Sequence, residues 1–226
     1  MITKSFKIPW SAVFSLAFLL LSGLLVVTIK VTGAREGGKV LEPEFARQNP
    51  VIFRDVQTKD GLGNIVKFRL GENLSVGDNW LKDTSFRVVN IARKPIVYLD
   101  LNLNFPDAKS ETTGPKMSYS FSFGRRPGSK FLQTEPPLFI KTGESLQVAL
   151  DKNYGQIVEF LGTKHFAIQN MNKVQLRVGF VAFADNTGWM AGMFYKQDPN
   201  DSSRYIPGDV SPFTKTGKDE KGGQKP

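Results

Sequence analysis

One stretch of strict alternation between apolar and polar residues limits the fold of this chain more than any other feature. Every second position from residue 97 to residue 105 is apolar, namely Val97, Leu99, Leu101, Leu103 and Phe105. The positions between them are Tyr98, Asp100, Asn102 and Asn104. Successive side chains of a strand point to opposite faces, so this period of two predicts a strand with one face in a core and one in water.

The same pattern returns along the chain, at residues 117–123, 146–150 and 174–180, where Val174, Leu176, Val178 and Phe180 are expected to share one face. Residues 51–58 and 65–70 read as two strands joined by a hairpin loop at 60–64, and Trp189 to Tyr195 as a last strand. The one helix candidate runs from Asp151 to Leu161 and carries apolar residues at helical spacing.

Seven or eight short strands with turns between them predict an all-β fold. We expect an antiparallel β-sandwich of immunoglobulin-like or fibronectin type III-like form with one short helix, preceded by an N-terminal transmembrane helix. Because the chain has no cysteine, such a sandwich lacks the inter-sheet disulfide of antibody domains.

The N-terminal segment carries a second strong signal. Residues 1–7 are short and basic, and Ile8 to Ile29 contains no charged residue. A helix of that length matches the thickness of a bilayer core. The segment is therefore predicted to be a signal-anchor that holds the chain in the inner (cytoplasmic) membrane, with the body on the extracytoplasmic, periplasmic side. The alternative is a secretory signal cleaved near Ala34, which would release the body.

These features divide the chain into an n-region (1–7), a transmembrane segment (8–29), a linker (30–50), a β-sandwich domain (51–210) and a disordered tail (211–226). Gly, Pro and charged residues without a period indicate the linker. The tail from Lys215 has no apolar residue to bury.

Composition excludes several classes of function. Without cysteine and with His165 as the one histidine, the chain has no thiolate site and no means to form a multi-histidine metal centre. The net charge is +9, but residues 1–34 contribute +3 and the tail +2, which leaves +4 for the body. This weak and scattered charge does not favour nucleic acid as a partner. No catalytic, cofactor-binding or metal-binding residue is predicted.

Three segments, Ser85–Pro106, Phe139–Leu150 and Gly188–Pro207, are similar to those of uncharacterised bacterial exported or membrane-anchored proteins. These segments also resemble bacterial immunoglobulin-like and fibronectin type III-like domains in two features. One is the turn from Asn to Lys-Pro, and the other is the sequence Thr-Gly-Glu-Ser directly before a strand. The resemblance covers most of residues 50–207. It implies a fold and no activity.

Two groups of residues are candidates for binding a partner. Arg125 and Arg126 stand in a Gly/Pro loop, where guanidinium groups can bind a carboxylate or phosphate, although an ordinary charged turn has the same composition. The second group combines aromatic and basic residues near the last strand: Trp189, Tyr195, Arg204 and Tyr205. Aromatic residues on a sandwich strand are more often part of the core.

The leading functional hypothesis is a non-enzymatic, membrane-anchored interaction or structural module with protein partners in the cell envelope, such as an accessory subunit of an envelope complex. The alternative is a module that binds carbohydrate or a surface polymer, which needs exposed aromatic residues. A hydrolase would need two carboxylates converging in a cleft. The oligomeric state has no sequence signal.

Overall fold

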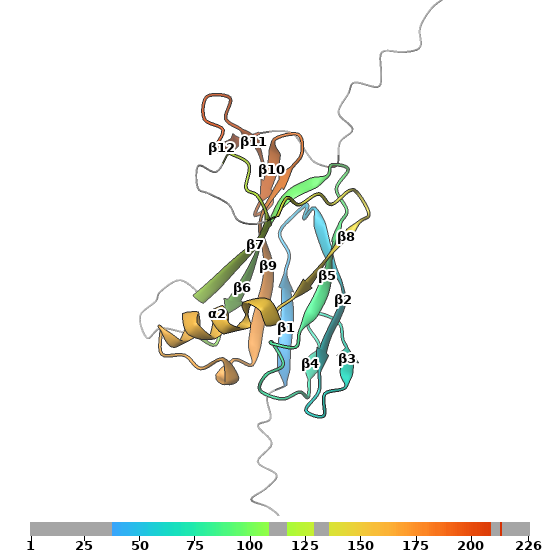
Figure 1. Ribbon diagram of the computed structural model, residues 1–226, viewed down its shortest axis with the longest axis vertical. Helices are drawn as coiled ribbons and strands as arrows, with labels where there is room; N and C mark the ends of the chain where they lie inside the picture. Colours follow the sequence, from blue (N-terminus) through green and yellow to red (C-terminus); the bar gives the residue numbers. More distant parts are fainter. Residues whose placement is uncertain (1–37, 109–116, 129–135, 209–212, 214–226) are drawn as a thin grey trace, which may run out of the picture. The chain divides into compact units, whose positions relative to one another are not determined.

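Two β-sheets face each other across a shared hydrophobic core (Figure 1). The computed structural model describes residues 38–108, 117–128, 136–208 and 213. The predicted transmembrane segment, Ile8–Ile29, lies outside them. Within the residues described, no helix combines the length and the apolarity needed to cross a membrane.

The larger sheet has eight strands: β1 (Lys39–Glu44), β4 (Asn73–Leu74), β6 (Ile96–Phe105), β7 (Met117–Gly124), β9 (Lys173–Phe183), β10 (Thr187–Met190), β11 (Met193–Gln197) and β12 (Tyr205–Pro207). The long strand β9 is its centre, with β6 paired along one edge and both β1 and β10 along the other. The pairing of β1 with β9 is parallel, and the others are antiparallel.

The smaller sheet has four strands in the order β3-β2-β5-β8: β2 (Val51–Lys59), β3 (Ile65–Lys67), β5 (Ser85–Asn90) and β8 (Ser145–Ala149). The predicted hairpin between β2 and β3 is confirmed, and Asp60 Oδ1 accepts hydrogen bonds from the Leu62 and Asn64 amides in its loop. The helix α2 (Asp151–Gly162) follows β8 at the predicted place, and η1 (Ile168–Asn170) is a short 3-10 turn before β9.

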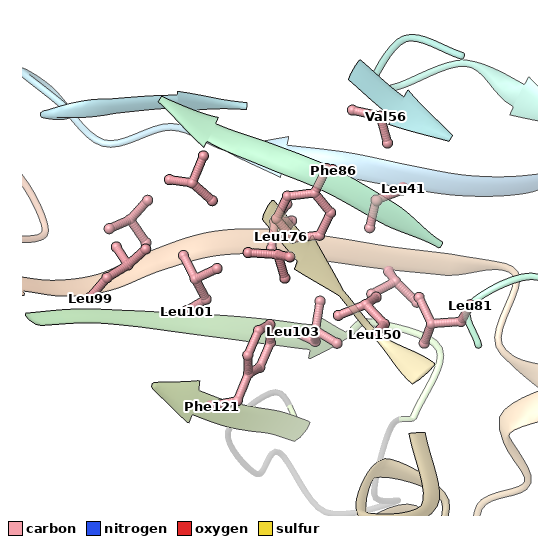
Figure 2. Packing of buried hydrophobic residues seen from close by; sticks show 14 of the residues in the cluster. Leu41, Val56, Leu81, Phe86, Leu99, Leu101, Leu103, Phe121, Leu150 and Leu176 are labelled. Carbon is pink, nitrogen blue, oxygen red and sulfur yellow. The ribbon is translucent and has the colours of Figure 1, made fainter. Parts of the chain in front are cut away.

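The core lies between the two sheets, as the all-β sandwich prediction requires (Figure 2). Leu99, Leu101 and Leu103 of β6 point toward Phe86 of β5, and Leu41 and Leu176 join them from β1 and β9. The alternation in β6 is confirmed from Leu99 onward. A register shift between Ile96 and Tyr98 moves Ile96 into the core in place of Val97.

The predicted linker at 30–50 needs correction, because β1 lies within it. Leu41 is fully buried, and the Lys39 ammonium is enclosed, donating hydrogen bonds to the carbonyls of Gln169 (2.8 Å) and Met171 (3.2 Å). The Gly-rich start and Pro43 hide this strand in the sequence, since both residue types are rare in strand interiors. The body therefore begins before Val51, and the described unit starts at Gly38.

The predicted last strand, Trp189 to Tyr195, is also wrong, because a turn divides it into β10 and β11. Ala191 and Gly192 both have positive φ angles, 51° and 88°, as the two-residue turns of tight hairpins require. Alanine seldom adopts a left-handed conformation, which hides this turn in the sequence. Strands β4 and β12 were not predicted either. Together with β1 and the division into β10 and β11, they bring the described residues to twelve strands rather than seven or eight.

Candidate functional site

A bulge in the central strand creates a site on the face of the larger sheet opposite the core. Asp100 of β6 pairs with Phe180 of β9, but the next pair is Leu101 with Val178, so Gly179 is the extra residue. The extra residue reverses the direction of the side chains that follow it. Phe180 therefore lies on the outer face, which corrects the prediction that it shares the core face with Val178.

Aromatic and cationic groups cover Phe180 on that outer face and leave it 8 % exposed. The ring of Tyr205 packs edge-on against it, with 5.1 Å between centroids, and Tyr98 lies 6.1 Å away. The Arg126 guanidinium carbon sits 5.4 Å above the Phe180 ring, within the range of a cation–π interaction. A second, small cluster thus forms outside the main core.

A pocket of about 580 Å³ opens beside this cluster, and we call it the outer-face pocket. Its floor comes from β6 and β9 and consists of Asp100, Asn102, Arg177, Gly179 and Phe180. Its walls come from the loop after β7, from β10 and β11, and from the chain leading into β12, and consist of Arg126, Met190, Tyr195, Ser203, Arg204 and Tyr205.

Two glycines allow this close arrangement. A Cβ at Gly179 would overlap Asp100 Oδ2 and lie 2.7 Å from Asn102 Nδ2, so the bare backbone makes room for those two polar side chains. Gly128 has a φ of 72°, and a Cβ there would overlap the Ser202 carbonyl. The loop that carries Arg126 therefore packs directly on the loop that carries Arg204.

The Arg204 loop is shaped by two aspartates. Asp198 Oδ1 accepts a hydrogen bond from the Asn200 amide (2.9 Å), and Asp201 Oδ1 accepts one from the Ser203 amide (3.0 Å). The Asp198 amide in turn donates to the Arg204 carbonyl (2.9 Å). These side-chain turns close the loop locally, and they present Arg204 and Tyr205 to the pocket.

The pocket contains charges and polar atoms that are only partly compensated. Arg177 is paired with Glu44, with 3.7 Å between Nη1 and Oε1. Among the residues described, the Tyr205 hydroxyl is buried without a hydrogen-bond partner. Burial raises the pKa of Tyr205, and the positive charge of Arg126 offsets part of this increase. Burial also raises the pKa of Asp100 to about 6, despite the opposing charge of Arg126.

This elevated pKa makes stability depend on pH. The folded chain holds the Asp100 proton more tightly than the unfolded chain. The stabilisation that comes from this bound proton is therefore fully present below about pH 4 and is lost as the pH rises through about 6. We expect Asp100→Asn to be more stable than the wild type at pH 7 by about 1 kcal/mol, a value reduced because the group is only half-buried. The gap should close at pH 4.

Urea unfolding of the full chain at pH 4 and pH 7 measures this gap. Asp78→Asn, at an exposed aspartate, serves as the control and should follow the wild type at both pH values. Equal stabilities of wild type and Asp100→Asn at pH 7 would contradict the interpretation that burial of the Asp100 charge is unfavourable.

Four of the six residues predicted from the sequence meet in the pocket: Arg126, Tyr195, Arg204 and Tyr205. Arg125 is exposed next to Arg126 and is not part of the lining. Trp189 is fully buried and belongs to the main core, because its register partner is the inward-facing Val181. Trp189 is therefore not a partner-binding residue, and the alternative that it belongs to the core is confirmed.

None of the five floor residues was predicted: Asp100, Asn102, Arg177, Gly179 and Phe180. A signal for the first two existed, since they are polar members of the alternating stretch and must share its solvent-facing side. The glycine within the strand pattern of 174–180 was also a signal, because an isolated glycine in a strand suggests a bulge. Only the register shows that Phe180 joins them.

A larger cavity of about 800 Å³ lies elsewhere, beside β2 and the segment that follows β3. It is lined by residues that include Phe45, Arg54, Asp55 and Arg69. Its lining carries three cations, Arg54, Lys67 and Arg69, and two anions, Asp55 and Glu72. Asp55 pairs with Arg87, and the Glu72 carboxylate accepts the Arg69 amide. The outer-face pocket is the better candidate because its lining combines three arginines and one carboxylate with a buried hydroxyl that has no partner among the described residues.

Comparison of the chain with protein-family models, with curated proteins and with solved structures found no match. Among the described residues, no group of three or more histidine or acidic side chains is placed to hold a metal ion. The chemistry available in the pocket is therefore that of guanidinium, carboxyl, amide and phenol groups.

Proposed function

We propose that the chain is a non-enzymatic interaction module whose binding site is the outer-face pocket. The observation that carries this proposal is the composition of the pocket walls. Arginine, tyrosine and methionine are enriched where proteins bind one another, and arginine and tyrosine are the residues whose loss most often weakens such complexes. Arg126, Arg204, Tyr195, Tyr205 and Met190 supply all three types in one place.

The proposed setting is the cell envelope, with Ile8–Ile29 as a membrane anchor, the body on the extracytoplasmic side, and the partner a protein of an envelope complex. Support for the anchor is the uncharged segment itself. The immunoglobulin-like or fibronectin type III-like identity of the sandwich stays a prediction and supports an adhesive rather than a chemical role.

A non-enzymatic role fits the carboxylates of the pocket. Of its described lining residues, Asp100 alone carries a carboxylate, whereas acid–base hydrolysis of a glycosidic bond uses two. Glu44 lies nearby but is held by Arg177 and by the Asn104 amide, which donates to Glu44 Oε2 at 2.8 Å. Glu44 would have to give up these partners to act in a catalytic pair.

Carbohydrate or surface-polymer binding is the alternative function. Its expected aromatic platform included Trp189, which is buried, so that support is lost. Tyr195 and Tyr205 remain beside the amide of Asn102 in the pocket, and ring faces next to amides suit sugar units. This alternative therefore rests on two aromatic residues instead of a row.

Affinity capture of the full chain from membranes, solubilised in mild detergent, tests the leading proposal. We expect a protein partner to be retained by the wild type and lost from the Arg126→Ala/Arg204→Ala variant. The matched control is Arg54→Ala/Arg69→Ala, which removes the same charge from exposed arginines at the larger cavity. It should retain the partner.

Two results of this capture would contradict the proposal. Recovery of the intact chain without any other protein in repeated captures would show that the proposed partner does not exist. Loss of the partner only from the Arg54→Ala/Arg69→Ala variant would show that the binding site is the larger cavity. Mass analysis of the same sample shows whether Met1 or a residue near Arg35 begins the mature chain, and a mature chain that starts near Arg35 would exclude the anchor.

A further inference from the structure

The charge of the outer-face pocket indicates what kind of group it binds. Three arginines and one aspartate line it, which leaves an excess of positive charge even when Asp100 is ionised. Arg177 is occupied by Glu44, whereas Arg204 is exposed and forms no ion pair with a described residue. An anionic group is therefore favoured near Arg204 and Arg126.

The buried Tyr205 hydroxyl adds a directional requirement. A buried polar group without a hydrogen bond is unfavourable, and within the described residues this hydroxyl has no partner. This hydroxyl has almost no accessible surface, so a small shift of the Tyr205 side chain is needed before an oxygen atom bound in the pocket accepts its hydrogen bond. A carboxylate has two such oxygens, so one can face the Tyr205 hydroxyl while the other faces a guanidinium group.

Asp100 favours a carboxylate over a phosphate monoester. Its side chain lies on the pocket floor and faces Arg126. A nearby negative charge repels a dianion more strongly than a monoanion, since the repulsion scales with the product of the charges. A single carboxylate is therefore attracted by the arginines and is repelled by Asp100 less strongly than a phosphate monoester is.

The remaining lining favours a peptide as the carrier of that carboxylate. Met190 and the rings of Tyr195 and Tyr205 offer apolar surface next to the arginines. The methylene groups of an acidic side chain match this surface, and a pocket of about 580 Å³ is large enough for a few side chains. Methionine in particular is typical of surfaces that bind protein segments.

We infer that the outer-face pocket binds an acidic peptide segment of its protein partner, with a carboxylate of that segment held by Arg126, Arg204 and the Tyr205 hydroxyl. This inference rests on the proposed function and adds the chemistry of the partner. The bound carboxylate shares Arg126 with Asp100, so protonation of Asp100 strengthens binding. Arg177 and Glu44 are the other charged pair at the pocket, and Asp185 is close enough to Tyr205 to help raise the pKa of its hydroxyl.

The test uses the full chain in mild detergent and a fluorescein-labelled octapeptide of alternating glutamate and alanine, capped at both ends. Fluorescence anisotropy at low salt should show saturable binding. We expect at least a tenfold weaker affinity for the matched glutamine peptide and for the Arg126→Ala/Arg204→Ala variant, as loss of charge-assisted hydrogen bonds predicts. The Arg54→Ala/Arg69→Ala variant should bind like the wild type.

Tyr205→Phe provides a second variant that keeps the ring and removes the hydroxyl. We expect it to melt at or above the wild-type temperature, because it removes a buried hydroxyl without a partner among the described residues. It should bind the glutamate peptide about fivefold more weakly, the effect of one hydrogen bond. Equal affinities for the glutamate and glutamine peptides, or equal affinities of wild type and Arg126→Ala/Arg204→Ala, would overturn the inference. Absence of any binding by the wild type would overturn it as well.

Competition separates the sources of the anion. Inorganic phosphate and an oligomer of galacturonic acid are added to the peptide complex in separate arms. Strong binding of the oligomer without binding of the peptide overturns the peptide assignment and favours the polymer-binding alternative. If the pocket variant loses the captured partner but the wild type ignores the glutamate peptide, the proposed function stands and the carboxylate inference alone fails.

Discussion

Replacing Trp189 with alanine is expected to lower the free energy of unfolding by about 3 to 5 kcal/mol, the usual cost of truncating a buried tryptophan. Trp189 is among the largest side chains that are fully buried here, and it packs in the core from β10. The cavity left behind would be lined by rigid strands that cannot collapse to fill it. Thermal unfolding of the full chain, followed by circular dichroism, measures the loss.

Two companion variants isolate the cause. Trp189→Phe keeps most of the apolar volume and removes an indole N–H that has no partner among the described residues, so it should cost less than about 2 kcal/mol. Met193→Ala, at a residue that is 56 % exposed in the neighbouring strand, should change stability by less than about 0.5 kcal/mol. A Trp189→Ala variant as stable as the wild type would mean that this side chain lies on the surface.

Asn90→Ala is expected to destabilise the chain by about 3 kcal/mol, because it removes three buried hydrogen bonds and leaves the Lys94 carbonyl and the Ala92 amide without a partner among the described residues. Asn90 is fully buried at the end of β5. Its Nδ2 donates to the carbonyls of Lys94 and Ile140, and its Oδ1 accepts from the Ala92 amide, each at 2.9 Å. One side chain thus replaces the missing backbone pairing where the chain crosses from one sheet to the other.

Asn170→Ala is the matched control, since Asn170 is exposed in η1, and its effect should stay within about 0.5 kcal/mol. Urea unfolding of both variants gives the comparison. A change of similar size in the two variants would show that the hydrogen bonds of Asn90 contribute no more than an exposed amide does. The same result would remove the structural reason for an asparagine before the Lys-Pro turn.

The sequence predicts those parts of the fold that depend on local pattern. The alternation in β6 depends on two-residue periodicity, and the helix α2 on apolar spacing of three and four. Ile157 and Leu161 of that helix are indeed buried, although Val158 is 39 % exposed. Such patterns are local because one face of each element must meet the core.

What the sequence did not predict depends on pairing between distant segments. Strand β1 exists because β9 and β4 offer hydrogen bonds on both of its sides, a circumstance that its own Gly- and Pro-containing sequence does not reveal. The outward turn of Phe180 depends on where β6 pairs with β9. Propensity is a weak guide wherever tertiary pairing decides the conformation.

The candidate site was predicted in part for the same reason. Loop residues such as Arg126 and Arg204 stand out because arginines beside turn residues are visible in any sequence. Their meeting at one pocket follows from the contact of Gly128 with Ser202, two residues far apart in the chain. Tyr195 and Tyr205 come together with them because β11 and β12 are paired.

The parallel pairing of β1 with β9 also determines how the body responds to pulling at its N-terminal end. Five register pairs, from Val40 with Lys173 to Glu44 with Arg177, join the two strands. A load applied at Gly38 along the strand axis stretches these evenly spaced bonds together rather than opening them one after another. Strand β1 is therefore expected to act as a shear joint, which distributes a load applied at Gly38 into the centre of the sheet.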